Sequence, residues 1–455
     1  MAARAPDAAA SPVDAPALDA TATERAAAPR ERGLAHAVVA LRSPSFARFW
    51  TGALLSNCGT WMQNVTIPYV LYQRTHSAAL IGVAGFAQFI PAMFLGPVGG
   101  WAADHYPRRS VLLVTQSIMG ALAVLLWALY VADLAPAWVL IALVFLGGVV
   151  AGVNIPSWQS FVVELVPRER LLNAVTLNSA QFNAARAIGP ALGGAVLARF
   201  GPSWAFLINA LSYGAVLVAL AGIRIDHVVH NERRDHQVLS QFRESLDYTR
   251  RHRGMLLAVC LVAAVAFLVN PVVQLVPVFA DDVFHVGAST YGLLAATFGG
   301  GAVVGAVVLG SLGSITRRGR LVGGAMLVYG AAVVGFGAAA NVVIAAAAAA
   351  VAGAAMLITV ANLNTSVQLL VPDALRGRLI ALYIMTFTGA YPIGSLVQGA
   401  LTDVVGPRAT VIGAAAVFLA VSVAVNVTPG LLSSLDEHRH TRRGRIAAVD
   451  EGAVP

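Results

Sequence analysis

The sequence contains no lysine, and all thirty of its basic residues are arginines. Alanine, glycine and valine are abundant, so we attribute this bias to the base composition of a G+C-rich bacterial gene and infer no function from it. Charged residues make up only 11% of the 455 residues, whereas a soluble domain has roughly 25%. This scarcity of charge excludes a soluble globular protein.

Cysteine is nearly absent too. Cys58 and Cys260 each lie inside a long apolar run, where cysteine packs as a small apolar side chain, so we expect neither a disulfide nor a metal site. The sequence also lacks a phosphate loop and a nucleophile triad, because its glycine pairs follow no strand. We therefore expect no enzyme activity, no cofactor and no nucleic-acid partner.

We also expect no cleavable signal peptide. Residues 1–42 are rich in alanine and proline with interspersed charges, and they contain no apolar core of the required kind. We expect a disordered cytoplasmic tail here, and the first apolar run then serves as the insertion signal.

What the sequence has in abundance is apolar residues, at 58% of the chain with a mean hydropathy of +0.74. Runs of about 18 or more such residues with few charges can cross a bilayer as helices. The sequence therefore predicts an all-α membrane protein with twelve transmembrane helices. The twelve runs lie near 47–73, 80–103, 111–132, 137–160, 171–198, 203–223, 255–280, 288–312, 321–340, 343–368, 379–402 and 408–428.

The second half of the chain repeats the first at a constant offset. Leu165-Val166-Pro167 recurs as Leu370-Val371-Pro372, and Gly201-Pro202 recurs as Gly406-Pro407, in both cases 205 positions later. A constant offset across a loop, a helix and the next turn means that two bundles share one helix order, as in parallel-repeat transporters. We therefore predict two pseudo-symmetric six-helix bundles and a transport function.

Arginines collect in alternate loops, as they do in short cytoplasmic loops. Both termini and the middle loop are therefore predicted to be cytoplasmic. The arginine-rich loops are at 108–109, 168–170, 317–320 and 376–378, and the opposite loops carry Asp133, Asp281 and Asp282.

The predicted domains are the disordered tail 1–42, the bundles 43–224 and 255–430, the cytoplasmic linker 225–254 and a basic tail 431–455. In the linker, Leu239, Phe242, Leu246 and Thr249 recur at helical spacing opposite charged residues. This pattern predicts an amphipathic helix at the membrane interface, acting as a tether of the two halves or as a regulatory contact. The final tail contains Arg439, Arg442, Arg443 and Arg445, which suit anionic lipid headgroups.

A loop signature lies between the second and third runs, at residues 99–109. Small residues at a helix end allow close helix contact, and a carboxylate there can accept from a neighbouring helix N-terminus or from an arginine. This segment is similar to the loop signature of the major facilitator superfamily, in which a glycine is followed by three residues, an aspartate and then two basic residues. The matching residues are Gly100, Asp104, Arg108 and Arg109.

The resemblance implies that Asp104 and Arg109 form a cytoplasmic latch that holds the outward-facing state. His105 and Pro107 depart from the pattern, so we expect a stiffer turn whose charge pairing depends more on pH. The alternative is a plain topogenic arginine pair beside an aspartate helix cap.

The fifth run contains a proline flanked by glycines. Proline kinks a helix, and glycines let it press against a neighbour. The segment is similar to the core of the antiporter motif of exporters in this superfamily, although Thr176 and Ala185 replace its first glycines. The resemblance implies export, and the alternative is an ordinary kink in a packed membrane helix. The residues assigned to this motif are Gly189, Pro190, Gly193 and Gly194.

One ionisable residue, Arg186, sits deep in a run, about 22 Å along a helix that begins at Leu171. Such an arginine is costly in a bilayer and is a functional candidate. Since no acidic residue lies at comparable depth in any run, Arg186 either meets an anionic substrate or binds carbonyls at kinked helix ends.

The other polar residues of the apolar runs gather in the first, fourth, seventh and tenth, which line the central cavity in the superfamily. Amides and an aromatic ring there would bind a polar, partly aromatic ligand, although each could instead bond a neighbouring helix. The predicted substrate-binding residues beside Arg186 are Asn57, Gln63, Asn154, Trp158, Asn270, Gln274, Asn362 and Asn364.

From residue 41 to about 425 the sequence resembles one branch of the superfamily, which contains the enterobactin exporter and related secretion-effector permeases. The resemblance implies a proton-coupled antiporter of the bacterial inner membrane that exports siderophores, antibiotics or other secondary metabolites by alternating access. We expect a monomer that binds a small-molecule substrate, protons and lipid. Glu164 either carries a proton or makes a cap or loop salt bridge. The alternatives are a proton-coupled importer of a small nutrient and a non-transporting membrane sensor.

Overall fold

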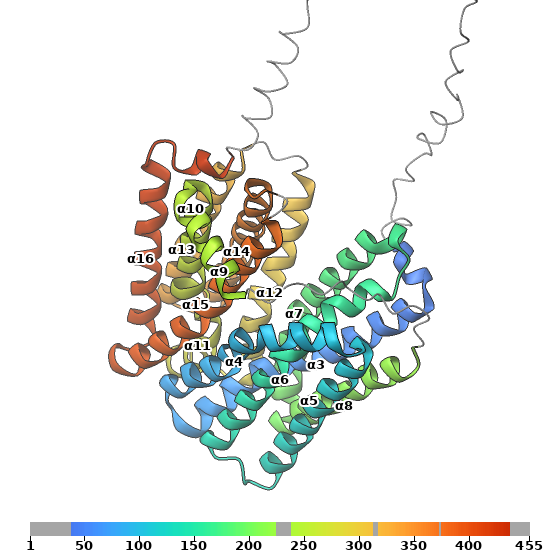
Figure 1. Ribbon diagram of the computed structural model, residues 1–455. Helices are drawn as coiled ribbons and strands as arrows, with labels where there is room; N and C mark the ends of the chain where they lie inside the picture. The colour runs from blue at the N-terminus through green and yellow to red at the C-terminus, as the bar shows by residue number, and fades with distance from the viewer. Residues whose placement is uncertain (1–37, 224–237, 313–316, 373–374, 437–455) are drawn as a thin grey trace, which may run out of the picture.

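The computed structural model describes residues 38–223, 238–312, 317–372 and 375–436. Within these ranges the regular elements are helices, arranged as two bundles that lean against each other (Figure 1). The predicted all-α fold of two six-helix bundles is confirmed. The N-terminal bundle consists of α3 (Pro44–Thr75), α4 (Ala78–His105), α5 (Arg108–Val131), α6 (Ala137–Glu164), α7 (Leu171–Phe200) and α8 (Pro202–Ala221).

The C-terminal bundle begins with a composite span. Two π-helical segments interrupt it, and π-bulges of this kind often mark functional sites. The span runs through α10 (Arg253–Ala264), a π-helix (Val265–Val269), α11 (Val272–Val278) and a second π-helix (Phe279–Val283). The bundle continues with α12 (Ala288–Ser311), α13 (Arg318–Ala338), α14 (Val342–Leu370), α15 (Arg376–Val405) and α16 (Pro407–Val427).

Ten helices of the described chain are long and apolar enough to cross a membrane. The other two long helices, α3 and α7, have 32 and 30 residues but carry more polar side chains. These two helices supply much of the polar cavity described below, so their lower hydropathy reflects the site.

The internal repeat is visible in the backbone. Helices α7 and α15 both have 30 residues and begin 205 positions apart. Each ends at a glycine with positive φ, 82° at Gly201 and 85° at Gly406, a backbone region that side chains strongly disfavour. Pro202 and Pro407 then begin α8 and α16, where the fixed φ of proline suits the first helical position.

The described parts of both predicted tails are ordered. Residues 38–42, which we expected to be disordered, include a 3₁₀ helix (Val39–Arg42), and the Ala40 N–H donates to Asn173 Oδ1 at 2.8 Å. At the other end a 3₁₀ helix (Leu432–Leu435) packs on the C-terminal bundle, and Asp436 caps α13 by accepting from the Arg318 and Gly319 N–H groups. The basic residues of the C-terminal tail lie outside the described residues.

The predicted linker helix is present as α9 (Val238–Arg251). It lies beside α10 and α15 of the C-terminal bundle (Figure 1). Thr249 is buried, whereas Arg243 and Asp247 are exposed, as the pattern predicted for these positions, and Glu244 pairs with Arg378 at 2.8 Å. The side chains of Leu239 and Phe242 lie outside the described residues.

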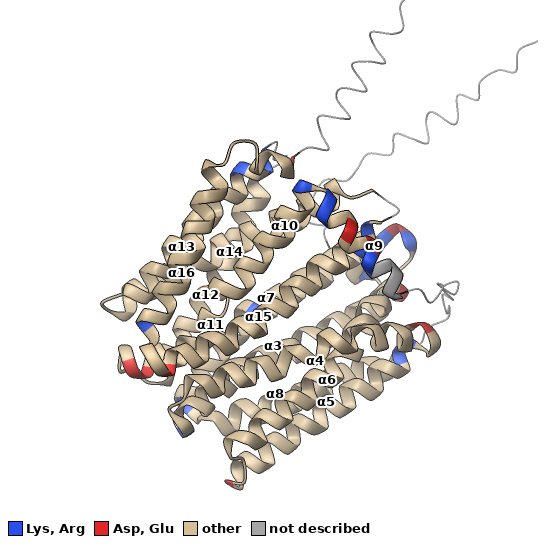
Figure 2. Cartoon of the chain, turned by 60° about the vertical axis from the view of Figure 1, so that its left-hand side comes forward, with Lys and Arg blue, Asp and Glu red and all other residues tan. Residues whose placement is uncertain are grey.

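Figure 2 shows that charged residues gather at the two ends of the helices. We call the end at which α3 begins and α16 finishes the termini end, and the opposite end the far end. The arginines Arg109, Arg170 and Arg378 lie at the termini end, because they flank the starts of α5, α7 and α15. The two bundles touch mainly between α4 and α15 and between α7 and α12.

Candidate functional site

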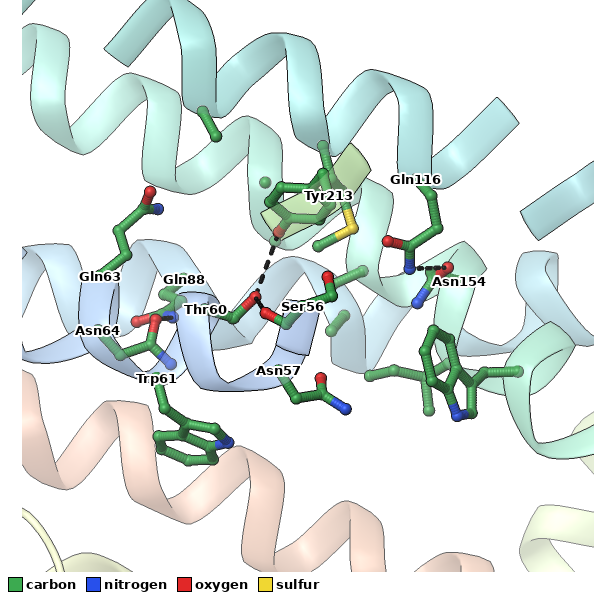
Figure 3. Close-up of a pocket in the computed structure, with 18 of the residues that line it drawn as sticks. Ser56, Asn57, Thr60, Trp61, Gln63, Asn64, Gln88, Gln116, Asn154 and Tyr213 are labelled. Carbon is green, nitrogen blue, oxygen red and sulfur yellow. Dashed lines mark hydrogen bonds between the residues drawn. The ribbon is translucent and has the colours of Figure 1, made fainter. Parts of the chain in front are cut away.

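A cavity of about 520 Å³ lies in the N-terminal bundle, next to the interface with the C-terminal bundle. All six helices α3 to α8 contribute to its wall. In Figure 3, Thr60 turns toward Tyr213, whereas Asn57 and Trp61 point to the other side of α3. A volume of this size accommodates a drug-sized organic molecule.

The cavity wall is rich in carboxamides, many of which bond to each other. Gln88 Nε2 donates to Asn64 Oδ1 at 2.9 Å. Asn154 Oδ1 accepts from Gln116 Nε2 at 3.1 Å and from the Thr115 hydroxyl at 2.8 Å. These bonds fix the side chains in orientation, which a binding site for a polar ligand requires.

Four of the predicted binding residues line this cavity: Asn57, Gln63, Asn154 and Trp158. Gln63 Oε1 accepts from Asn209 Nδ2 at 2.6 Å, and Trp158 Nε1 donates to Asn178 Oδ1 at 3.3 Å. The predicted binding residues of α3 and α6 therefore line the same cavity.

Four more of the predicted binding residues lie apart from the cavity, in the C-terminal bundle. Gln274 lies beside Tyr391, and Asn362 Nδ2 donates to Ile358 O of its own helix at 2.8 Å. Asn364 Oδ1 accepts from Gln368, and Asn270 is buried beside the first π-helical segment. The structure thus splits the predicted set between the two bundles.

Arg186 on α7 is not part of the cavity wall, but it stacks on a residue that is. Its Cζ lies 5.4 Å from the ring centroid of Trp61, a cation–π contact. Tyr391 and Tyr329 of the C-terminal bundle are near enough to interact with it electrostatically. Within the described residues no carboxylate pairs with its guanidinium, and no carbonyl accepts from it.

The glycines of the α7 motif mark close helix crossings. A Cβ at Gly189 would overlap Trp61 of α3, and one at Gly193 would lie 2.9 Å from Val65 Cγ2. A Cβ at Gly194 would overlap the backbone of Gly292 on α12, so this glycine serves the contact between the two bundles. Pro190 is buried between these crossings.

In the structure the residues of the loop signature do not form a closed latch. Asp104 is exposed, and no described residue bonds to it. Arg108 instead forms a buried ion pair with Glu164, with Nη1 and Oε1 2.6 Å apart, so Glu164 makes the salt bridge that was one of its two predicted roles. Arg109 donates to the Leu220 and Ala221 carbonyls at the end of α8. A Cβ at Gly100 would meet no other atom.

At the far end the bundles are held together by a helix cap. Asp403, near the end of α15, accepts from the Ala78 N–H at 2.6 Å, the Ala79 N–H at 3.1 Å and the Ser77 hydroxyl at 2.7 Å. These donors form the N-terminus of α4, whose positive end favours a carboxylate. Asp403 therefore bridges the two bundles at this end.

Three further contacts close the far end. The Tyr72 hydroxyl on α3 donates to Asp282, and the Tyr291 hydroxyl on α12 donates to Val65 O at 2.6 Å. The backbone of α15 near Ser395 lies against Gly82 of α4. Toward the termini end, by contrast, the helices of the two bundles diverge (Figure 1). The two bundles thus form a wedge that is closed at the far end (Figure 1).

Sequence reasoning missed several residues of this site. Gln88 on α4, Gln116 on α5 and Tyr213 on α8 line the cavity, although we expected the first, fourth, seventh and tenth spans to supply the site. Each is a polar residue in a strongly apolar run, and this signal could have identified them. The bonds of Asp403 and Tyr72 depend on contacts between the two halves, and no sequence pattern indicates them.

Comparison with known proteins identifies the family. The profile of a family described as transmembrane secretion effector matches residues 35–443. A staphyloferrin A transporter of Staphylococcus aureus is 23% identical, covering 79% of this chain and 89% of that protein. The multidrug efflux pump Tap of Mycobacterium tuberculosis is 25% identical, covering 81% and 89% respectively.

Solved structures support the same fold. A bacterial homologue of the human lysosomal transporter Spinster, in an inward-facing and unoccupied conformation, aligns with a TM-score of 0.67 at 14% identity, covering 86% of this chain and 97% of that one. The inward-open xylose transporter XylE from E. coli aligns with a TM-score of 0.63 at 13% identity, covering 86% and 98%. The predicted resemblance is confirmed: this multi-pass protein of the bacterial plasma membrane belongs to the transmembrane secretion effector family of major facilitator transporters, which move small molecules.

Proposed function

We propose that this transporter is a proton-coupled exporter that works by alternating access. The observation that carries the proposal is the wedge: a polar cavity lies beside an interface that is sealed at one end only. Such an arrangement is one of the two states of a cycle in which two rigid bundles rock about a central site. To reach the other state, the far-end contacts must break and the termini end must close.

The observed state is the inward-facing one if the termini are cytoplasmic. We propose this orientation because the arginines of the loops concentrate at the termini end. Asp104 then faces the cytoplasm with no partner among the described residues, as we expect for a latch that engages only in the outward-facing state. In that state it would bond to Arg109 or to a neighbouring helix N-terminus.

Export is the direction that the relatives and the α7 motif favour. Two of the relatives are described as efflux proteins, Tap and the macrolide efflux protein A of Streptococcus pyogenes, the latter 19% identical over 63% of this chain and 71% of its own length. Gly189, Pro190, Gly193 and Gly194 match the exporter motif in sequence and lie at close helix contacts. We propose siderophores, antibiotics or other secondary metabolites as the exported class.

Arg186 is the residue that we propose to bind an acidic group of the substrate. An unpaired arginine within a membrane-spanning helix is costly unless it serves a function. It lies at the interface of the two bundles, because its own backbone approaches Gly299 of α12. An anion bound there would contact both bundles and so link substrate binding to their movement.

A proton-release assay tests the proposal. Inside-out vesicles containing the protein, with an acid interior and a trapped pH-sensitive dye, receive siderophores, drugs and organic anions one at a time. We expect at least one compound to be taken up and to release protons from the vesicles, while vesicles without the protein show neither effect. Uptake without proton movement would contradict the antiport, and no uptake across the panel would contradict transport.

A further inference from the structure

We infer that the cavity of the N-terminal bundle holds the uncharged, hydrogen-bonding body of the substrate, and that Gln181 and Gln116 are the residues that bind it. This inference rests on the proposed function, because it names the class of molecule that the transporter moves. Together with Arg186, it points to an organic acid whose body carries amide, hydroxyl or carbonyl groups beside an aromatic or aliphatic frame.

The cavity wall is neutral. Among the thirty residues that line it are ten carboxamides, and none of the thirty is an aspartate, glutamate, arginine or histidine. Burying an ionised group without a partner is strongly unfavourable. Carboxamides, in contrast, offer both donors and acceptors to uncharged polar groups. The lining therefore selects an uncharged portion of a ligand.

Two of these carboxamides have buried polar atoms without a hydrogen-bond partner within the described chain. Gln181 is only 1% exposed, yet neither its Oε1 nor its Nε2 makes a hydrogen bond. Gln116 is also buried, and its Oε1 has no partner although its Nε2 bonds to Asn154. A buried polar atom without a partner costs about 1 to 3 kcal/mol, so a ligand that reaches these atoms with both a donor and an acceptor would recover that cost.

Aromatic rings form another part of the cavity wall. Trp61, Phe182 and Trp158 line the cavity, and Trp61 and Phe182 contact each other edge to face with centroids 5.9 Å apart. Such rings suit a flat apolar portion of a ligand. The ligand body thus needs both an apolar surface and several hydrogen-bonding groups.

Trp61 connects this neutral cavity to the positive charge of Arg186. One residue lines the cavity and also contacts the guanidinium, so a single ligand can place its body among the carboxamides and its acidic group near Arg186. The two parts of the site would then contribute separately. Contact of the acidic group with Arg186 would produce the preference for anions. The carboxamides would bind the body of the ligand whether or not the ligand carries a charge.

A matched pair of probes separates these contributions. N-acetyltryptophan and N-acetyltryptophanamide share one aromatic, amide-bearing body and differ only in a carboxylate or a carboxamide. Their dissociation constants are measured by calorimetry on the full-length protein in lipid nanodiscs. For the wild type we expect the carboxylate to bind more tightly than the amide.

Gln181→Leu should weaken both probes by the same factor, about tenfold. It should not lower the unfolding temperature, because the lost amide has no hydrogen-bond partner among the residues that the structure describes. Arg186→Gln should remove the preference for the carboxylate and leave amide binding unchanged. The control Gln73→Leu changes an exposed glutamine outside the cavity and should alter neither constant. Gln181→Met is a second variant in case the leucine variant fails to fold.

The inference is overturned if both Gln181 variants bind the probes as the wild type does, or if the wild type binds neither probe. Those results leave the proposed function standing when the vesicle assay shows coupled uptake of any compound. Conversely, probe binding that depends on Gln181, without uptake of any compound in vesicles, supports the binding site and contradicts the exporter.

Discussion

At the scale of single residues, the ion pair between Arg108 and Glu164 is a contact whose loss we expect to be costly. Their side chains are 9% and 6% exposed, so the pair is buried at the termini end of α5 and α6. Removing one member of such a pair leaves the other charge buried and unpaired, which commonly costs about 3 to 5 kcal/mol.

We therefore expect Glu164→Gln to lower the unfolding temperature of the purified protein strongly, because it leaves the charge of Arg108 buried without its partner. The double variant Arg108→Gln with Glu164→Gln should recover part of the loss, since neither charge remains. Thermal unfolding in detergent measures both. A glutamine variant with unchanged stability but no proton-coupled transport would show instead that Glu164 carries the proton.

At the scale of helices, the crossing of α7 and α12 depends on two facing glycines. Backbone meets backbone where Gly194 opposes Gly292, and overpacking such a contact costs about 1 to 3 kcal/mol. The same α7 carries the motif that we connect with export, so this crossing is where the motif acts on the contact between bundles.

Gly194→Ala should therefore force α7 and α12 apart and slow transport by roughly tenfold. The matched control is Gly300→Ala on α12, where an added Cβ would meet no other atom. Initial rates of uptake in vesicles, corrected for the amount of folded protein, give the comparison. Equal rates for the two variants would show that the close crossing is not needed for the cycle.

A second contact between elements is the cap that Asp403 of α15 provides for α4. Loss of a capping side chain typically costs about 1 kcal/mol, and here the loss affects the contact between bundles rather than one bundle alone. Asp403→Ala should therefore shift the protein toward a state that is open at the far end.

The control for this prediction is Asp436→Ala. Asp436 also caps a helix, but both partners belong to the C-terminal bundle, so its loss should lower stability without moving the equilibrium between states. Reaction of a cysteine that replaces Ser395, a buried residue of the closed far-end contact, with a membrane-impermeant maleimide reports the opening in a protein whose two native cysteines are replaced by serine. If neither aspartate variant changed the labelling rate, the capping contact would not hold the far end closed.

At the scale of the whole molecule, the sequence was sufficient to predict the fold. The offset of 205 residues predicted the repeated helices, and α7 and α15 have that spacing in the structure. Hydropathy alone was a weaker signal for α3 and α7, because these helices carry the polar side chains of the site. The two π-helical segments, the first of which ends beside Asn270, have no pattern that hydropathy reveals.

The site was predicted only in part, for a physical reason. Polar residues in apolar runs identified Asn57 and Asn154, but a cavity depends on how six helices pack around it. The placement of Gln274 and Asn362 away from that cavity, and the bond between Asp403 and α4, result from the mutual position of the two bundles. No periodicity within one helix encodes that position.

The most direct test of alternating access is a pair of spin-label distances across the two bundles. Labels at Glu169 and Leu312 report the termini end, and labels at Leu134 and Val404 report the far end, in a protein whose two cysteines are replaced by serine. Pulsed electron resonance in lipid nanodiscs, across pH and with a transported compound, gives both distances. We expect the termini-end distance to shorten while the far-end distance lengthens, and distances that stay fixed or change in the same direction would contradict the rocking of the two bundles.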